Sequence, residues 1–589
     1  MFKDCKLLPY PKKIKKTDGF FKTDNCEIAI SDKLDSRVFS AANKVRKELS
    51  AADSTYHKLY MGVSDNGIII NTDCGLGAEE YRLEITERSV KLTGGNVAGC
   101  FYGLQTLKQL IKCYKSSIPA FQIHDWPDLK FRGFYHDATR GRVPTVDGVK
   151  RIIDTLAELK YNSFQLYVEH TFDFAEFSGL NRSEQDYLTA DDILEIDNYC
   201  YENFIDFIPS LSTFGHMYEL LSLKDYSHLC ELENYKPQFH FWKERMLHHT
   251  IDASNPESFK TVCSLIDQYL PLFRSGYFNI CCDETFDICL GRNKGKDKGK
   301  LYCEFVNRLI NYIASKGKTA MIWSDIVLKY PEYINQISKD TVFLNWDYEA
   351  EPNLKTVDVI SKSGYTQIVC PGTDSWASLI ENPKVSFSNI TKLIGYGAEK
   401  QCFGALITNW GDYGHPAPFE CALSGTALGA AKAWNVSTVA NEAFESSVSF
   451  IIYSANDNIV PYIREIAYAN KITPWQLFVS KDKAAIKNAL KDSGAELADS
   501  AEKCLQTAEK LSESGENELI IRQLITAARG TALLNSAGRL LLSDGDFSEW
   551  KKEADKWLKE YKECWLLGNK PSELYVIEEY INFIPSIGH

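Results

Sequence analysis

The sequence lacks several features, and each absence excludes a class of protein. No stretch approaches the roughly 18 apolar residues that cross a bilayer, and no apolar run follows the lysines near the amino terminus. We therefore expect neither a membrane anchor nor a signal peptide, and we predict a cytoplasmic protein. Positive charge is in deficit, because 66 basic residues stand against 79 acidic ones for a net charge of −13. This balance argues against nucleic acids and membranes as partners.

Residues that commonly hold metals are also sparse. The 17 cysteines are odd in number and scattered, and they form no paired CxxC set of the kind found in zinc sites. In a protein without an export signal, such cysteines are expected to be reduced thiols. We predict neither a bound metal nor a cofactor.

The composition is that of a globular protein with several domains. Apolar residues make up 44% and charged residues 25%, and the length allows two to four domains. Residues 1–128 predict a small α+β domain, with helical patterns at 38–49 and 98–111 and a linker at 125–128. Its strand-like runs, bounded by turn signals, are 26–30, 59–63, 67–70, 81–85 and 89–92.

In residues 129–436, short apolar runs alternate with helical segments. The eight candidate strands are 133–137, 163–168, 206–211, 277–282, 319–323, 341–346, 366–370 and 403–409. The helical segments between them include 146–160, 191–202, 256–273, 301–316 and 419–434. Strand and helix repeated eight times predict an α/β fold, a (β/α)8 TIM barrel. An open doubly wound sheet is the alternative, but eight units in about 300 residues favour closure.

Residues 437–589 predict a C-terminal α-helical domain. Long amphipathic patterns occupy 516–542 and 547–564, and no strand-like alternation interrupts them. We expect these helices to pack on the barrel. Formation of a homodimer, or a contribution to the rim of the cleft, is the alternative.

Polar and aromatic side chains follow every predicted barrel strand at the same end. Barrel enzymes build their active sites at that end, so we predict an active site there. In strand order these residues are Asp137 and Arg140, Glu169 and His170, His216, Asp283 and Glu284, Trp323 and Asp325, Trp346 and Asp347, Asp374 and Trp376, and Trp410 and Asp412.

The adjacent carboxyl groups of Asp283 and Glu284 suggest acid catalysis of glycoside cleavage. That reaction needs a carboxylic acid still protonated near neutral pH, and a second group that opposes the developing oxocarbenium charge. The apolar strand before the pair predicts burial, which together with the neighbouring anion would raise a carboxyl pKa. Four indoles either wall a sugar pocket or plug the top of the barrel core. They are Trp323, Trp346, Trp376 and Trp410.

Motifs within residues 60–435 resemble those of glycoside hydrolase family 20, the β-N-acetylhexosaminidases. In the amino-terminal part, Tyr81-Arg82-Leu83-Glu84-Ile85 and the segment 103–110 look like the non-catalytic domain of that family. In the barrel, the similar motifs are Arg132-Gly133 with Asp137 and Arg140, Phe214-Gly215-His216, Asp283-Glu284, and Trp410-Gly411-Asp412.

The resemblance implies an exo-acting, retaining enzyme that removes terminal, non-reducing β-linked GlcNAc or GalNAc from oligosaccharides or glycoconjugates. Glu284 would protonate the glycosidic oxygen and later activate water. Asp283 would orient the substrate's 2-acetamido group, which attacks the anomeric carbon to give an oxazolinium ion. This substrate-assisted route needs no separate carboxylate nucleophile. The resemblance also implies that Arg140 and Asp412 hold ring hydroxyls and that His216 lies beside the acid.

The sequence departs from the family pattern at three places, which suggests a divergent, intracellular branch. Asn279-Ile280-Cys281-Cys282 stands where the family usually has His-x-Gly-Gly. Glu169-His170-Thr171 replaces Asp-Asp-Gln, which makes Glu169 a support residue of the site. Trp376 lies near the position of a tyrosine that donates a hydrogen bond to the acetamido oxygen, and an indole N–H can donate too.

Other functions remain open at this point. A metal-dependent barrel hydrolase could use His136, Asp137, His170, His216 and Asp283 as ligands, although the first strand has no His-x-His pair and the 11 histidines are few. A sugar-binding protein without catalysis could use the same cleft. A family 20 barrel with altered specificity is the third alternative. The lysine-rich segment 291–300 is expected to be a solvated loop, and a contact with a sulfated sugar is its alternative role.

Overall fold

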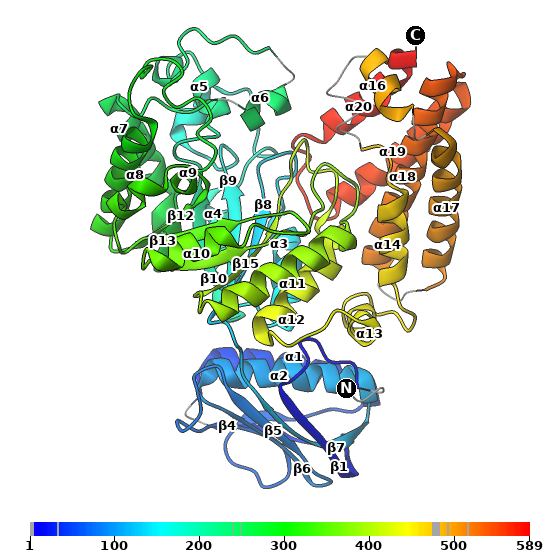
Figure 1. Ribbon diagram of the computed structural model, residues 1–589. Coiled ribbons are helices and arrows are strands. Elements are labelled where there is room, and N and C mark those ends of the chain that lie inside the picture. The colour runs from blue at the N-terminus through cyan, green and yellow to red at the C-terminus, as the bar shows by residue number, and fades with distance from the viewer. Residues whose placement is uncertain are drawn as a thin grey trace.

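The computed structural model describes residues 5–31, 34–238, 241–247, 249–473, 483–491, 494–514 and 518–588. Figure 1 shows three parts, with a small sheet domain below a barrel and a group of helices beside the barrel. All 17 cysteines are free thiols. Within the described residues, no helix combines the length and the apolar character needed to cross a membrane.

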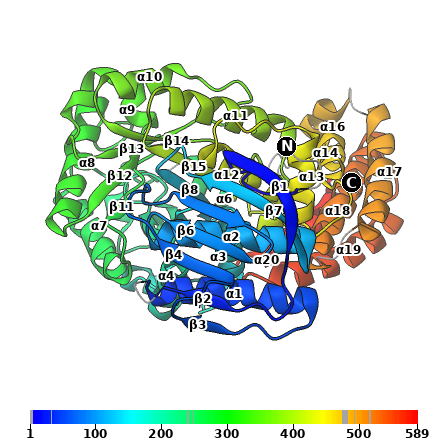
Figure 2. The same ribbon diagram turned by 90° about the horizontal axis from the view of Figure 1, so that it is seen from below.

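The amino-terminal part is a seven-stranded sheet in the order β1-β7-β5-β6-β4-β2-β3. Its strands are β1 Lys13–Lys22, β2 Ile28–Ile30, β3 Leu59–Met61, β4 Gly67–Thr72, β5 Tyr81–Ile85, β6 Ser89–Gly94 and β7 Ser117–Asp125. Helices α1 (Ser36–Asp53) and α2 (Val97–Tyr114) cover the face that looks toward the barrel, and Figure 2 shows the opposite face. The sequence did not predict β1 and β7. Strand β1 carries four lysines in ten residues and lies at the sheet edge, so its apolar alternation is weak.

Buried polar contacts join this sheet to the barrel. Asp125, at the end of β7, accepts a hydrogen bond of 3.0 Å from the indole N–H of Trp434 and lies 3.2 Å from the ammonium group of Lys160. Arg132 at the start of the barrel donates to both carboxylate oxygens of Glu79, at 2.8 and 2.9 Å. Because these charges are paired and hydrogen-bonded, they are satisfied without water.

Eight parallel strands close into a barrel, as predicted. They are β8 Phe131–Asp137, β9 Ser163–Val168, β10 Asp206–Leu211, β11 Tyr277–Asn279, β12 Thr319–Trp323, β13 Val342–Trp346, β14 Thr366–Cys370 and β15 Gly404–Asn409. The helices of this part are α3 Val146–Glu158, α4 Ala190–Glu202, α5 Tyr218–Ser222, α6 Phe241–Leu247, α7 Pro256–Tyr269, α8 Lys298–Ser315, α9 Asp325–Lys329, α10 Lys355–Lys362, α11 Pro383–Glu399 and α12 Leu423–Trp434. The open doubly wound sheet is therefore excluded.

Strand β11 is shorter than the predicted 277–282. Cys281 and Cys282 have φ angles of 55° and 65°, in the left-handed region, so the regular strand ends before them. Backbone pairing with β12 nevertheless continues, because Ile280 N–H donates to the Met321 carbonyl and Trp323 N–H donates to the Cys281 carbonyl, both at 3.0 Å.

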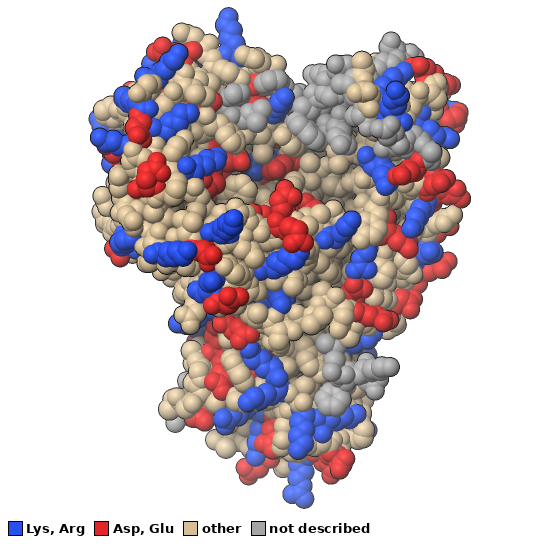
Figure 3. Space-filling model, viewed as in Figure 1, with Lys and Arg blue, Asp and Glu red and all other residues tan. Residues whose placement is uncertain are grey.

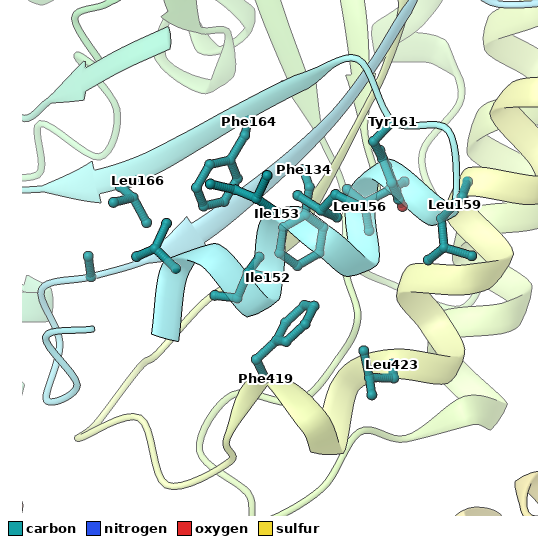
Figure 4. Close-up of a cluster of buried hydrophobic side chains, with 14 of the residues drawn as sticks. Phe134, Ile152, Ile153, Leu156, Leu159, Tyr161, Phe164, Leu166, Phe419 and Leu423 are labelled. Carbon is teal, nitrogen blue, oxygen red and sulfur yellow. The ribbon is translucent and has the colours of Figure 1, made fainter. Parts of the chain in front are cut away.

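The core between the barrel strands and their helices is apolar. In Figure 4, Phe134 of β8 and Phe164 of β9 face Ile153 and Leu156 of α3, and Phe419 closes the cluster. All five side chains are buried. Helix α3 begins where the hydroxyl of Thr145 accepts a hydrogen bond from the N–H of Gly148, a typical amino-terminal cap. This packing sets the carboxyl ends of β8 and β9 in place.

The carboxyl-terminal part is helical, as predicted, and lies beside the barrel (Figure 1). Its described helices are α13 Glu442–Ile451, α14 Val460–Ala469, α16 Lys483–Leu490, α17 Gly494–Ser512, α18 Glu518–Ser543, α19 Ser548–Leu566 and α20 Leu574–Gly588. Helices α18 and α19 correspond to the patterns at 516–542 and 547–564, although residues 516 and 517 lie outside the described residues. Arg142 of the barrel stacks on the Trp565 ring at 4.0 Å and donates to the Tyr561 hydroxyl at 3.1 Å.

Candidate active site

The predicted site residues lie at the carboxyl ends of the barrel strands. Asp283 and Glu284 follow β11, and the φ angle of Glu284 is 45°. His216 after β10 and Tyr413 after β15 also have positive φ angles, 56° and 60°. Non-glycine residues rarely adopt this conformation, and such residues gather at functional sites where the surrounding structure holds them. In Figure 3, acidic side chains are visible in the hollow between the barrel and the C-terminal helices.

His216 lies against both carboxyl groups of the pair. Its Nε2 is 3.3 Å from Oε2 of Glu284 and 3.7 Å from Oδ2 of Asp283. Its Nδ1 is 3.3 Å from the backbone carbonyl of Arg245. Burial opposes a charge on this ring, but the contacts with Glu284 and Asp283 outweigh burial and raise the pKa of His216 to about 9. The imidazole is therefore a cation at neutral pH.

The charge on His216 corrects one expectation for the acid. Burial acts to raise the pKa of Glu284, but the cationic His216 and the more distant Arg140 hold it below its usual range. The pKa of Asp283 is raised, mainly by burial, with Glu284 adding to the effect against His216. The prediction of a raised pKa is thus wrong for Glu284 in the free protein and right for Asp283. In the resting His216–Glu284 pair, the proton therefore lies on His216.

Asp325 also belongs to this group of residues. Its Oδ2 accepts a hydrogen bond of 3.2 Å from the backbone N–H of Glu284, which fixes the start of the loop after β11. Burial, together with the charges of Asp283 and Glu284, raises the pKa of Asp325 to about 7. The sequence placed Asp325 after the fifth strand without selecting it as a site residue. Its position two residues after Trp323 was the available signal.

Arg140 joins residues from three strand ends. Its guanidinium donates to Oδ1 of Asp412 at 3.0 Å and to Oδ2 of Asp137 at 3.4 Å, and its Nε lies 3.7 Å from Oε1 of Glu169. It also stacks between two aromatic rings, with distances of 4.9 Å to Tyr167 and 5.1 Å to Trp410. The structure therefore brings Arg140, Glu169 and Asp412 together. Tyr167, which donates to Glu169 at 2.8 Å, was not anticipated.

The four indoles occupy different environments. Trp323 has 0% exposure and belongs to the cluster of side chains that fills the barrel interior, where its ring lies 5.7 Å from that of Trp410. This placement matches the alternative in which an indole plugs the barrel core. Trp346 and Trp376 are half-buried, and both pack on the ring of Tyr348, with 5.1 and 5.0 Å between ring centres.

Tyr348 links these indoles to the rest of the site. Its hydroxyl accepts a hydrogen bond of 2.7 Å from the indole N–H of Trp410, whose ring faces Arg140. Trp346, Trp376 and Trp410 are therefore connected through one tyrosine that the sequence did not single out. Because Tyr348 follows β13 by two residues, the strand-end rule could have found it.

Two of the residues considered for a metal site, Asp137 and His136, are held by other groups. Asp137 accepts hydrogen bonds from the backbone N–H groups of Thr139, Arg140 and Gly411 at 2.9 to 3.0 Å. His136 is buried against the Asn409 side chain, and burial lowers its pKa to about 4. Among the described residues, no three histidine, cysteine or carboxylate side chains gather as a metal site requires.

The lysine-rich segment 291–300 is tied by the side chain of Asn293 to the chain between β10 and α7. The amide of Asn293 donates to Oε2 of Glu231 at 2.5 Å and to Oδ1 of Asp252 at 2.7 Å, and Lys296 donates to the Asn293 oxygen at 2.7 Å. A contact of this segment with a sulfated sugar stays a prediction.

Two family models match the chain. Residues 4–126 match the model described as glycosyl hydrolase family 20, domain 2, and residues 129–386 match the model described as glycosyl hydrolase family 20, catalytic domain. The chain belongs to glycoside hydrolase family 20. The resemblance seen in the sequence is thereby confirmed.

Individual relatives are distant. The chain is 27% identical over 364 residues to a beta-hexosaminidase of Porphyromonas gingivalis, in an alignment that covers 55% of this chain and 46% of that protein. It is 22% identical to a beta-hexosaminidase of Vibrio furnissii, over 66% of this chain and 67% of that protein. The chain thus spans about half of the Porphyromonas protein. Among solved structures, a chitobiase of Flavobacterium johnsoniae has the same fold, with a TM-score of 0.66 and 21% identity over 94% of this chain and 96% of that one.

Proposed function

We propose that this protein is an exo-acting, retaining β-N-acetylhexosaminidase that removes terminal β-linked GlcNAc or GalNAc by substrate-assisted catalysis. The observation that carries the proposal is the arrangement of Asp283 and Glu284. These consecutive residues lie at the carboxyl end of a barrel strand, and both carboxyl groups contact the His216 cation. Family 20 membership and the beta-hexosaminidases among the relatives support it.

Glu284 acts as the acid, with the proton supplied by its pair with His216. In the free protein this pair holds one proton, on the imidazole, at neutral pH. A sugar bound over Glu284 removes water from the carboxylate, which raises its pKa and favours transfer of the proton across the 3.3 Å contact. The protonated Glu284 then donates to the glycosidic oxygen. After the leaving group departs, Glu284 as carboxylate activates water.

Asp283 orients the acetamido group of the substrate. The acetamido oxygen attacks the anomeric carbon, and the acetamido nitrogen acquires positive charge in the oxazolinium ion. The carboxylate of Asp283 accepts a hydrogen bond from the acetamido N–H and balances the positive charge on that nitrogen. Because the nucleophile belongs to the substrate, two successive inversions at the anomeric carbon retain its configuration.

The other site residues hold the sugar in place. Arg140 presents a planar fork of N–H donors, and Asp412 presents acceptor oxygens, so the pair suits the hydroxyl groups of the ring. Trp410, Tyr348 and Trp376 form an aromatic surface suited to the sugar face or to the acetamido methyl group. Glu169 supports Arg140, from which it lies 3.7 Å.

Release of 4-nitrophenol from its β-GlcNAc and β-GalNAc glycosides tests the proposal. The wild-type protein should cleave at least one of them, with the same rate in EDTA, because the proposed reaction needs no metal. Asp283→Asn and Glu284→Gln should each lower kcat by about 100-fold or more, the usual contribution of such groups. A folded wild-type protein that cleaves neither glycoside, or that loses its activity in EDTA, would contradict the proposal.

A further inference from the structure

The segment between α19 and α20, residues 567–573, packs on the site face of the barrel. We name it the α19–α20 connector. Its Lys570 N–H donates to the Val143 carbonyl at 2.8 Å, and its Ser572 hydroxyl donates to the Gly141 carbonyl at 2.7 Å. Gly141 directly follows Arg140. The connector therefore holds the loop that carries the arginine of the proposed sugar site.

Glu573, the last residue of the connector, holds a second loop of the site. Its Oε2 accepts hydrogen bonds of 3.0 Å from the indole N–H of Trp242 and from Nη1 of Arg245, both on α6. Arg245 is 4% exposed, and Glu219 accepts from its Nε at 2.9 Å. A buried guanidinium held by two carboxylates has little freedom to move, because a shift would break charge-assisted hydrogen bonds where little water can replace them.

The backbone of Arg245 then contacts His216. The Arg245 carbonyl lies 3.3 Å from Nδ1 of His216, while Nε2 of the same ring lies 3.3 Å from Oε2 of Glu284. An acceptor on Nδ1 fixes the plane of an imidazole and directs its second nitrogen. A continuous set of contacts thus runs from Glu573 through Arg245 and His216 to Glu284.

Helix α6 also supports a third loop, the one after β15 that carries Asp412. A Cβ atom on Gly414 would lie 1.9 Å from the Trp242 ring, so the indole packs directly on that glycine. Tyr580 of α20 donates to the Tyr413 carbonyl at 3.3 Å and packs on Trp242 with 5.1 Å between ring centres. The C-terminal helical part therefore contacts three loops of the proposed site.

We propose that Glu573 is a positioning residue for the reaction: it fixes α6 so that the Arg245 carbonyl holds the His216 ring against Glu284. The inference rests on the proposed function of the same site. It assigns the C-terminal helices a part in catalysis beyond packing. Glu573 itself touches neither the acid nor the sugar.

The charged groups that face His216 come from several elements. They are Arg140 after β8, Glu169 after β9, Asp283 and Glu284 after β11, and Asp412 after β15, while Arg245 of α6 meets the ring through its backbone carbonyl. Glu573 is separated from the ring by Arg245. A change at Glu573 should therefore reach His216 through the orientation of the ring.

The test compares Glu573→Gln with Lys570→Met. Lys570 lies on the same connector and pairs with Asp192 of α4 at 3.1 Å, so its loss also removes one ion pair to the barrel but leaves α6 intact. The His216 pKa is followed by ¹³C-histidine NMR in the full-length protein and assigned with His216→Asn. In Glu573→Gln the pKa should fall by about one pH unit, because the ring loses its acceptor, and in Lys570→Met it should not change.

Kinetics give the second readout. On the 4-nitrophenyl glycoside, Glu573→Gln should lower kcat by about tenfold with KM unchanged, Glu573→Asp should retain most of the rate, and Lys570→Met should match the wild type. An unchanged His216 pKa in Glu573→Gln, or equal effects of Glu573→Gln and Lys570→Met, would overturn the inference. If Glu573→Gln does not fold, Glu573→Asp is measured in its place. Its His216 pKa should fall by less than the one unit expected for Glu573→Gln, and an unchanged pKa would overturn the inference. An inactive wild type would refute the proposed function alone, since the NMR comparison needs no activity.

Discussion

Nε2 of His216 lies 3.3 Å from Oε2 of Glu284, and the pKa of this histidine is raised to about 9 despite its burial. The two groups share one proton across the neutral range. Activity should therefore fall on the alkaline side as the pair loses that proton, with a midpoint near pH 9. On the acid side it should fall as Asp283 is protonated, at a pH above the usual range of an aspartate, because the pKa of Asp283 is raised.

The pH dependence of kcat/KM for the wild type and for His216→Asn checks this account. Without the cation, the proton of Glu284 is held by the carboxyl group alone, so the alkaline limb should move to lower pH by about one unit or more. An alkaline limb that is the same in both proteins would show that His216 does not share the proton.

The loss in Glu284→Gln should depend on the leaving group. A glutamine cannot donate the proton, so glycosides with poor leaving groups should lose about 1,000-fold or more in kcat/KM. An aryl glycoside with an acidic phenol needs less protonation and should lose much less. Comparison of the 2,4-dinitrophenyl glycoside with a disaccharide measures the difference. Equal losses on both substrates would contradict the assignment of Glu284 as the acid.

Arg140 should be needed for its planar shape as well as its charge. It donates to Asp412 and lies between the rings of Tyr167 and Trp410, so Arg140→Lys keeps the charge but loses the fork and the stacking. We expect kcat/KM to fall by about tenfold or more. Arg308 is a matched control, since it stacks on Phe259 at 4.1 Å on the surface, and Arg308→Lys should leave kcat/KM unchanged.

Gly414 should tolerate no side chain. Its φ angle is +98°, and a Cβ atom would meet the Trp242 ring at 1.9 Å. Gly414→Ala should cost about 3 kcal/mol of unfolding free energy, from strain and overpacking together. Gly317 has a φ angle of +76° with nothing within 4 Å of its Cβ position, so Gly317→Ala should cost only about 1 kcal/mol. Urea unfolding measures both variants, and equal costs would contradict the packing argument.

Much of the barrel could be predicted because its strands are short, continuous apolar runs. The bounds of β9, β10, β12 and β14 agree with the sequence-based ranges. The end of β11 could not be predicted, because the left-handed conformation of Cys281 and Cys282 depends on the packing around them. Strand β1 was missed because this edge strand is rich in lysine and its apolar alternation is weak.

The members of the site could be predicted, but their protonation could not. Asp283, Glu284 and His216 were predicted because each follows a barrel strand, and in the structure His216 contacts both carboxyl groups. The direction of the Glu284 pKa depends on the distance to a histidine from another strand, which no spacing in the sequence encodes. The contact of Glu573 with α6 was equally invisible, since it joins parts of the chain far apart in sequence.

In the proposed reaction the nucleophile is the substrate's own acetamido group. The most direct measurement compares hydrolysis of 4-nitrophenyl β-GlcNAc with that of 4-nitrophenyl β-glucoside, which differs only in carrying a hydroxyl at C2. Because the glucoside has no acetamide to act as nucleophile or to be oriented by Asp283, its kcat/KM should be lower by at least about 1,000-fold. Comparable rates on the two substrates would contradict it and would require a nucleophile from the protein.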